Sequence, residues 1–329
     1  MLVRAGAAVA TTLPGLRRLW RGGGSGAAAC FPLSRALLAV RGAEAAAFLQ
    51  GLLTNDVTRL VAEGSPPAGA GGTAAPARAL YAHALNVQGR CLYDVILYRL
   101  HKSPEEEPRI LLECDNSVLD ALQKHLKLYK IRRKVNITPC LDLSLWAIVP
   151  REGTGDIASS LTQCADQALI LTPDPRTEAM GWRLITKKGA NLSEIIPGSH
   201  IGDVEDYHRH RYKQGIPEGV KDLPPGVALP LESNLAYMNG VSFTKGCYIG
   251  QELTARTHHV GVIRKRLLPV QISAPLPKDS IPEGAEILTQ SGKSAGKFRA
   301  GRGDLGIALL RFPLEGLKSH GDVVLRNVV

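Results

Sequence analysis

Alternation of apolar and polar residues predicts the strands in the first half of the chain. The segments 79–86 and 91–100 alternate on either side of Gln88 and Gly89, a pattern typical of a β-hairpin. Three further runs are apolar and bounded by turn residues, as strands usually are. These expected strands are 109–114, 131–137 and 143–149.

Apolar residues at helical spacing predict three helices. Segment 44–53 is expected to form a short one. Asp115 is a suitable N-cap for a second helix, because several apolar residues follow it at helical spacing. These residues are Val118, Leu119, Leu122 and Leu126. A third helix near 204–214 is expected to end at Gly215, since glycine is common just beyond a helix C-terminus.

Changes in the pattern indicate separate structural units. Segment 64–76 is rich in glycine, alanine and proline and has few large apolar groups to pack, so we expect a flexible loop. Residues 181–185 form another strand-like run, and beyond Gly261 the chain shows short β segments with glycine and proline turns. That tail predicts a small barrel or sandwich. The pattern alone supports an α+β protein with a β tail.

Residues 1–30 have the composition of a mitochondrial presequence. They contain four arginines and no acid, and the first acidic residue of the chain is Glu44. A secretory signal is disfavoured, because Pro14 and the pair Arg17 and Arg18 interrupt the apolar run that it would need. No later segment has the length of a membrane span. The mitochondrial matrix is therefore the expected location.

Composition and charge describe a basic globular protein. Apolar residues make up 44% of the chain, and the formal net charge is +10, or +6 without the four leader arginines. Cationic clusters at 130–134, 208–211 and 264–266 could attract nucleic acid, an acidic protein or a polyglutamylated folate. Aromatic residues are not interleaved with these clusters and no RNA-binding motif is found, which disfavours nucleic acid.

The six cysteines are scattered. None belongs to a C-x-x-C pair, which argues against a zinc ribbon or a self-contained cluster site, and a reducing compartment disfavours disulfides. Cys91 and Cys114 lie in strand-like runs and are expected in the core. Cys30 falls at the presequence boundary, where we expect it to be lost or frayed. The other three are Cys140, Cys164 and Cys247.

Cys247 stands in a setting that favours reactivity. Gly246 and Gly250 flank it and allow the backbone to turn sharply and to approach a ligand. A helical turn is expected from Gln251, so Cys247 would lie just ahead of a helix N-terminus, with Lys245 two residues away. Both effects favour the thiolate. A small buried thiol is the alternative, and residue types alone leave both interpretations open.

The octet around this cysteine carries a family resemblance. Its residues are Lys245, Gly246, Cys247, Tyr248, Ile249, Gly250, Gln251 and Glu252. It matches the signature of the YgfZ branch of the folate-binding glycine-cleavage T-protein (GcvT) family. Further similar segments follow in order at 48–57, 85–90, 215–217 and 229–232. With its basic leader, the chain most resembles the mitochondrial iron–sulfur cluster assembly factors of this branch.

The resemblance implies an α+β fold with two mixed α/β subdomains around a central folate-type opening, plus a C-terminal β-barrel. The expected units are a presequence at 1–30, a T-protein-like core at 31–261 whose subdomains divide near 140–150, and a barrel at 262–329. Tetrahydrofolate is the implied cofactor. The residues expected to line its cavity are Asn86, Arg90 and Tyr93.

The T-protein that this chain resembles is an aminomethyltransferase with two adjacent aspartates in the second hairpin strand, the first of them catalytic. Tyr93 takes the first place here and Asp94 the second. A phenol with a pKa near ~10 cannot replace a carboxylate that must be ionised at neutral pH. We therefore assign no catalytic residue, and folate-dependent aminomethyl transfer is the alternative function.

Coordination arithmetic supports an assembly role. A two-iron cluster takes four thiolates, or histidines in place of some, and the motif supplies one thiol. The resemblance implies that a [2Fe–2S] cluster is shared or transferred between Cys247 and an A-type carrier protein, the chain alone being a monomer. His258 and His259 could add a ligand, although a solvated helix end is the favoured interpretation. A cysteine enzyme or persulfide carrier is a third class, and it would need a general base beside Cys247.

Overall fold

A computed structural model of the 329-residue chain gives the fold, and it describes most of the sequence. The described residues are 2–5, 28–61, 77–100, 106–150, 168–272, 281–289, 292–311 and 322–325. The expected flexible loop at 64–76 lies outside them, as does most of the expected presequence. No helix among these residues is long and apolar enough to cross a membrane.

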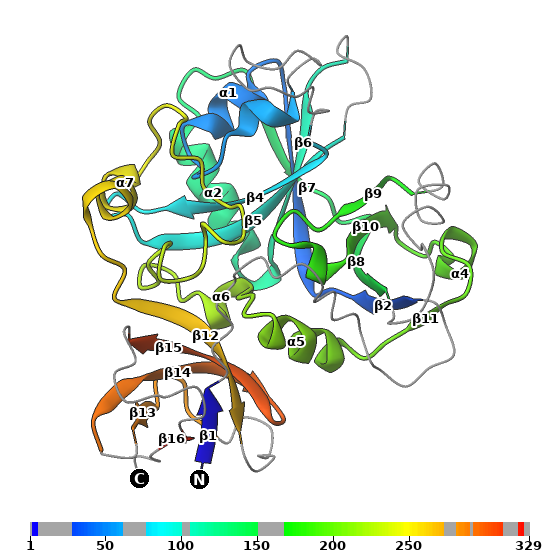
Figure 1. Cartoon of the computed structure of the whole chain (residues 1–329). Helices are drawn as coiled ribbons and strands as arrows, with labels where there is room; N and C mark the ends of the chain where they lie inside the picture. Colours follow the sequence, from blue (N-terminus) through cyan, green and yellow to red (C-terminus); the bar gives the residue numbers. More distant parts are fainter. Residues whose placement is uncertain are drawn as a thin grey trace, which may run out of the picture.

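The first sheet has five antiparallel strands in the order β4-β5-β6-β3-β7, with helices α1 and α2 packed on one face (Figure 1). Its strands are β3 (Arg35–Arg41), β4 (Ala79–Leu85), β5 (Cys91–Arg99), β6 (Arg109–Asp115) and β7 (Asn136–Pro139). Its helices are α1 (Ala45–Gln50) and α2 (Leu119–Tyr129).

The second sheet also has five strands, in the order β11-β2-β8-β10-β9. They are β2 (Ala28–Pro32), β8 (Leu143–Pro150), β9 (Ile170–Pro173), β10 (Trp182–Lys187) and β11 (Ser199–Ile201), and the short helix α4 (Leu192–Ile195) covers the outer face. The chain passes from β2 to β3 over two residues, so consecutive strands belong to different sheets.

Period-two alternation explains how the two sheets share one core. On β3, Leu38 and Val40 point to the helices α1 and α2, whereas Leu37 and Ala39 point to the opposite face. That second set packs against the inner face of the second sheet, which contributes Phe31 among others. The result is a layered body of helices, sheet, sheet and helix, with most of the apolar core between the layers.

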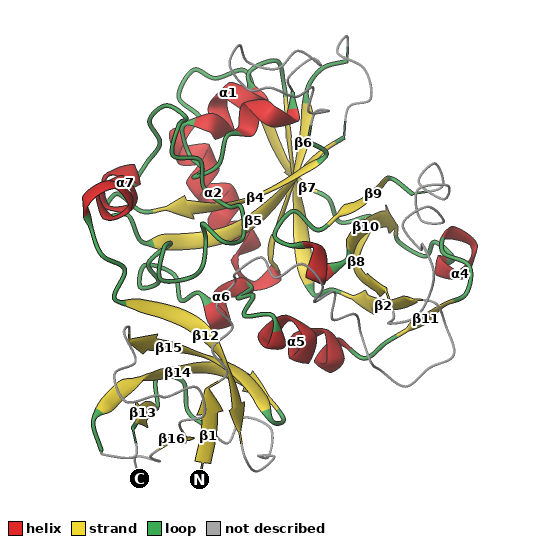
Figure 2. Cartoon of the chain, viewed as in Figure 1, coloured by secondary structure: helices red, strands yellow, loops and turns green. Residues whose placement is uncertain are grey.

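The C-terminal unit is a closed barrel in the order β1-β12-β15-β14-β13-β16. Its strands are β1 (Leu2–Ala5), β12 (Lys265–Ile272), β13 (Glu286–Leu288), β14 (Ser294–Arg302), β15 (Leu305–Arg311) and β16 (Asp322–Leu325). Figure 2 shows the barrel below the two-sheet body, with α5 (Val204–Lys213) and α6 (Gly219–Asp222) between them. Helix α7 (Gln251–Val260) lies at the edge of the body and leads into β12.

The expected α+β class, with two mixed subdomains and a terminal barrel, is confirmed. The hairpin of β4 and β5 and the helices α1, α2 and α5 lie where the pattern predicts them, although α1 is shorter and ends at Gln50. The prediction of a strand that starts at residue 131 is wrong, because β7 begins only at Asn136. Ile131 is exposed and Arg132 has a positive φ of 58°, so the chain turns there before it pairs with β3.

The expected fate of Cys30 is also wrong. Cys30 lies inside β2 and is fully buried, with β11 on one side and β8 on the other. Burial raises the pKa of its thiol to about 11, in spite of a hydrogen bond with Ser199. Cys91 and Cys114 are buried, as the pattern predicts.

Candidate functional site

The cysteine loop lies beside the tip of the β4–β5 hairpin. Gly250 is the residue before α7 and has a φ of 76°, a conformation that glycine adopts at little cost. A Cβ on Gly250 would lie 2.2 Å from the carbonyl oxygen of Asn86 and 3.1 Å from the Cα of Gly89. The cysteine octet and the hairpin turn are far apart in the chain, and they meet through Gly250 and Gly89.

Lys245 fastens this loop to the end of α1. Its Nζ donates hydrogen bonds to the carbonyl oxygens of Gln50 at 2.7 Å, Leu53 at 2.7 Å and Asn55 at 2.8 Å. Carbonyls at a helix C-terminus lack helical partners, and a cation there is favourable. Burial lowers the pKa of Lys245 to about 8, although the nearby Asp56 opposes the shift.

These contacts give Lys245 a role in fixing the loop, while its expected effect on the Cys247 thiolate stays a prediction. All three N–H donors of its ammonium group are directed to carbonyls, and none is left for the Cys247 sulfur. Lys245 positions the loop that carries Cys247. The ammonium also lies 5.0 Å from the centre of the Tyr248 ring, which adds a cation–π contact.

Three other residues of the octet are anchors as well. The N–H of Tyr248 donates to Oε1 of Gln251 at 2.9 Å, and the N–H of Ile249 donates to the carbonyl of Gly51 at 3.1 Å. The Tyr248 and Ile249 side chains pack against two different apolar clusters. Burial raises the pKa of the Tyr248 phenol to about 12. The expected helix begins at Gln251, four residues after Cys247.

The remaining residues of the octet face solvent. Gly246 and Cys247 are exposed, and nothing lies within 4 Å of a Cβ placed on Gly246. Glu252 is exposed too and forms an ion pair with Arg256 one helical turn later. The anchors therefore fix the two ends of a short projection, and Cys247 is at its tip. Cys247 is the exposed cysteine of the described residues.

The described residues contain no group of three or more histidine, cysteine or acidic side chains that could hold a metal ion. Cys30, Cys91 and Cys114 are buried and Cys140 is half-buried, whereas Cys164 lies outside the described residues. His258 and His259 are exposed at the end of α7, which agrees with the interpretation of a solvated helix end. The His258 ring stacks on Phe243, with ring centres 3.5 Å apart.

The three residues expected to hold a folate make contacts with different parts of the chain. Asn86 accepts a hydrogen bond from the Arg90 N–H, and the Arg90 side chain is exposed and donates to the carbonyl of Val227 at 2.9 Å. Tyr93 points away to α2, where its ring contacts His125. Cavities of about 270 and 290 Å³ occur in the described part of the protein, and none of the three residues lines either one.

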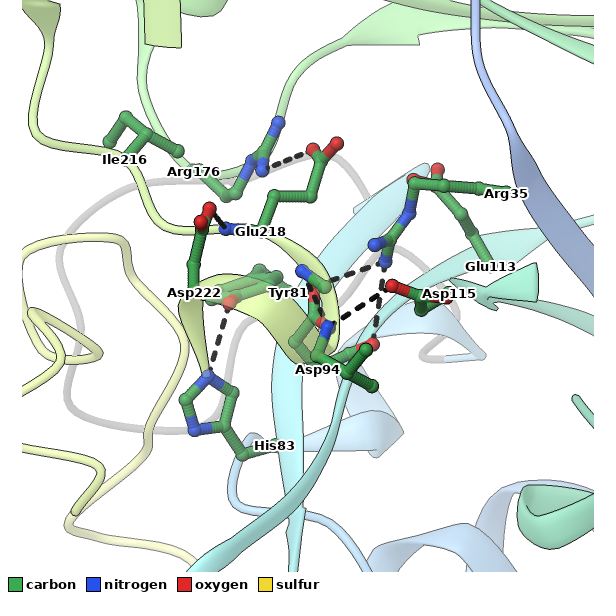
Figure 3. A network of polar contacts seen from close by, with 12 residues as sticks. Arg35, Tyr81, His83, Asp94, Glu113, Asp115, Arg176, Ile216, Glu218 and Asp222 are labelled. Carbon is green, nitrogen blue, oxygen red and sulfur yellow. Dashed lines mark hydrogen bonds and ion pairs between the residues drawn. The ribbon is translucent and has the colours of Figure 1, made fainter. Parts of the chain in front are cut away.

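A buried ion network links residues of the two sheets, and Figure 3 shows Arg35, Asp94 and Glu218 among its members. Arg183 on β10 donates to Glu218 at 2.8 Å, to Asp174 at 3.0 Å and to the Tyr207 hydroxyl at 2.9 Å. Arg176 donates to Glu218 at 2.7 Å and to Asp174 at 2.8 Å. These side chains come from β10, α5 and the segments flanking β9 and α6, so the network joins the second sheet to the helical layer.

The first sheet enters the same network through Arg35. Its guanidinium contacts Asp94 at 3.1 Å and also Glu113, and Glu113 lies 3.4 Å from Arg183. Asp94 further accepts a hydrogen bond from the N–H of Gly219, the first residue of α6. Asp94 and Tyr93 thus point to opposite faces of β5, as neighbours on a strand do.

Paired charges make this burial tolerable. Burial alone would raise the pKa of Glu218, but the charges of Arg176, Arg183 and Arg35 outweigh it and hold the pKa well below its usual value. Asp174 behaves in the same way, with Arg176 and Arg183 as its partners. The sequence carried a signal for these residues, since charged residues such as Glu113 and Arg183 interrupt otherwise apolar strands.

Comparisons with known proteins agree with this geometry. Residues 264–322 match the family model described as the CAF17 C-terminal beta-barrel domain. The chain is 60% identical over 285 residues to the mitochondrial iron-sulfur cluster assembly factor IBA57 of Homo sapiens, covering 86% of this chain and 77% of the relative. For the Mus musculus protein of the same name the identity is 56%, with coverage of 86% and 77%.

The chain belongs to the IBA57 family. Among solved structures, the aminomethyltransferase T of the glycine cleavage system from Bartonella henselae matches with a TM-score of 0.63, covering 92% of this chain and 86% of that one. The identity is 16%, so this likeness shows the fold that the IBA57 family shares with the transferase.

Proposed function

We propose that the protein is a mitochondrial iron–sulfur cluster assembly factor that holds a [2Fe–2S] cluster jointly with an A-type carrier, and that Cys247 is its one thiolate ligand. Family membership supports the assembly role, because the relatives carry that name. The observation that supports Cys247 is its exposure at the tip of a loop that is anchored by Lys245 on one side and by Tyr248 on the other.

Coordination supports a shared cluster. A two-iron cluster takes four ligands, and the described residues offer no second exposed cysteine beside Cys247. Burial raises the pKa of Cys91 well above its usual value and that of Cys114 to about 12, so both remain protonated thiols. Protonated, buried thiols do not ligate iron. We therefore assign the missing ligands to a partner.

The loop is suited to this task. A fixed backbone places the Cys247 sulfur without an ordering cost when the partner arrives. Gly246 has no side chain to obstruct a cluster that approaches the thiolate. The basic leader and the naming of the relatives support a location in the mitochondrial matrix, where the protein would support the maturation of other iron–sulfur proteins.

Aminomethyl transfer is not supported by the site. Burial raises the pKa of the Tyr93 phenol, so it stays protonated at neutral pH. Asp94 is held by Arg35 and by the N–H of Gly219. Tyr93 has no carboxylate and the carboxylate of Asp94 is already paired, and the folate candidates line neither of the two cavities described above. We derive no chemical step through folate.

Reconstitution with a carrier tests the proposal. The wild-type protein is mixed with an A-type carrier, ferrous iron and sulfide under anaerobic conditions, and visible and EPR spectra are recorded after gel filtration. We expect a cluster in the complex and none on the protein alone. Cys247→Ser should abolish it, because an alcohol is a poor iron ligand. Cys140→Ser, at a half-buried cysteine, is the matched control and should keep it.

Two results would contradict the proposal. One is a stable cluster on the wild-type protein without any partner. The other is an unchanged spectrum of the complex with Cys247→Ser, which would show that this thiolate is not a ligand.

A further inference from the structure

Exposed apolar side chains gather near the cysteine loop. Eleven large apolar residues are exposed in the described part of the chain, and five of them lie on or around α7. These five are Val87, Val227, Leu253, Val260 and Val262, and we call them the α7 face. Val87, Val260 and Val262 are 71%, 82% and 77% exposed, values that are unusual for so many neighbouring valines.

Helical spacing and the contacts of the hairpin turn place four of these residues near one another. Leu253 and Val260 are seven residues apart, so they lie on the same side of the helix, two turns from each other. A Cβ on Gly89 would lie 2.8 Å from the Leu253 Cβ, which places the hairpin turn that carries Val87 against the start of the helix. The bond from Arg90 to the Val227 carbonyl brings Val227 to the same turn.

The α7 face adjoins Cys247 at one end. Cys247 precedes α7 by four residues, and the chain on its other side returns along the helix, where Phe243 stacks on His258. Any protein that supplies the other ligands must bring its own cysteines within bonding distance of the cluster that Cys247 also binds. A specific interface of that kind covers roughly 800 Å² on each partner, which extends well beyond one side chain.

Charges at the margin define the chemistry of the occupant. Arg90, Arg256 and Arg264 are exposed beside the α7 face, while Glu252 is the acid on the helix and is paired with Arg256. The margin is therefore net positive. An apolar centre with a charged margin is the usual composition of a protein interface.

We propose that the α7 face is the docking surface for the cluster carrier, which meets it with an apolar patch bordered by acidic side chains. This inference rests on the proposed function. Docking supplies affinity and orientation, and Cys247 supplies the iron ligand. The two contributions are separate, so they can be measured separately.

A titration distinguishes docking from ligation. A carrier loaded with a [2Fe–2S] cluster is titrated with the full-length protein, and visible circular dichroism follows the change in cluster coordination. Val260→Asp should shift the midpoint to a concentration at least about tenfold higher, with the same final spectrum, because a charge within an apolar contact surface weakens binding without removing a ligand. Higher ionic strength should weaken binding of the wild type, since the charged margin is screened.

Matched variants make the result decisive. Ile201→Asp alters a residue that is 65% exposed on β11, which lies on the opposite side of the molecule from α7 in Figure 1, and should leave the midpoint unchanged. Far-ultraviolet circular dichroism should show that both variants are folded. If Val260→Asp has the same titration midpoint as the wild type while Cys247→Ser loses the final spectrum, the assignment of the docking surface is wrong and the proposed function stands. If Cys247→Ser keeps the final spectrum, the proposed function itself fails.

Discussion

The central ion network and the cysteine loop use polar groups in opposite ways. In the centre, Arg35, Arg176 and Arg183 are buried, and acidic side chains surround them. At the loop, every anchor is satisfied, but Cys247 at the tip is exposed and has no ligand partner among the described residues. A group whose bonding is complete within the chain holds the fold, whereas a group left incomplete is available to another molecule.

This contrast also separates the protein from the enzyme whose fold it shares. The carboxylate next to the expected catalytic place is Asp94, and it is bound to Arg35 and α6 as part of the network. The space between the sheets is thus a structural connection between subdomains. The chemistry that we propose lies at the edge of the body, beside α7. The following predictions test this division, beginning with the largest expected effect.

Removing one arginine from the network should be severely destabilising. Arg183→Met leaves Glu218 and Asp174 buried with an incomplete set of partners, and loss of one member of a buried ion pair costs about 3–5 kcal/mol. Urea unfolding of the isolated protein measures this loss. Arg209→Ala, in the exposed pair with Asp304, is the control and should cost less than about 1 kcal/mol. Equal effects of the two variants would contradict a structural role for the network.

Acid should destabilise the protein below about pH 6.5. Burial lowers the pKa of His83 to about 4, although Asp94 opposes the shift, so the folded protein keeps this imidazole neutral. The unfolded chain binds the proton near pH 6.5, and stability therefore falls as pH drops from 6.5 towards 4. The loss from His83 is roughly 3 kcal/mol at most. Unfolding free energies at several pH values measure it, and His83→Gln should have a smaller pH slope.

The N-terminal boundary can be placed by truncation. A variant that begins at Ala28 keeps all of β2, whereas one that begins at Phe31 loses three buried residues of that strand. We expect the shorter variant to be less stable by about 2 kcal/mol, since each buried methyl group contributes nearly 1 kcal/mol. Thermal unfolding of the two compares them directly. Equal midpoints would show that residues 28–30 do not contribute to the second sheet.

Loss of the loop anchor should have a smaller effect on stability and a visible effect on the site. Lys245→Met leaves three carbonyls at the end of α1 without their donor, which costs about 1–3 kcal/mol. The loop that carries Cys247 then loses its fixed position, so formation of the shared cluster should need a higher protein concentration. Lys127→Met, at an exposed residue of α2, is the control. An unchanged cluster titration with Lys245→Met would argue against a positioning role.

The sequence predicted the regular elements better than the contacts between them. Alternation found β4 and β5, and helical spacing found α2, because these patterns depend on neighbouring residues. The assignment of strands to the two sheets could not be predicted from local patterns, since β2 and β3 are adjacent in sequence but belong to different sheets. The pairing of Arg183 with Glu218 likewise depends on where β10 and α6 meet in space.

The candidate site was predicted only in part, because the motif is local in the sequence whereas its contacts come from distant segments. The octet identified Cys247, and the structure places it ahead of a helix start, as expected. Whether its side chain is buried or exposed was left open by the residue types, and the structure exposes it. The partners of Lys245 could not be predicted, because they lie at the end of α1 and just after it, far away in the sequence. The folate candidates were chosen by resemblance, and the structure directs Tyr93 to α2 and the Arg90 side chain to the carbonyl of Val227.

Native mass spectrometry of the complex with the carrier tests the central claim most directly. The spectrum gives the mass of the intact complex and so counts the iron and sulfide ions that it holds. For the wild type we predict one copy of each protein with two irons and two sulfides, and for Cys247→Ser a folded protein, as stable as the wild type, without any cluster-bearing complex. A complex of Cys247→Ser that retains the full cluster would contradict the account.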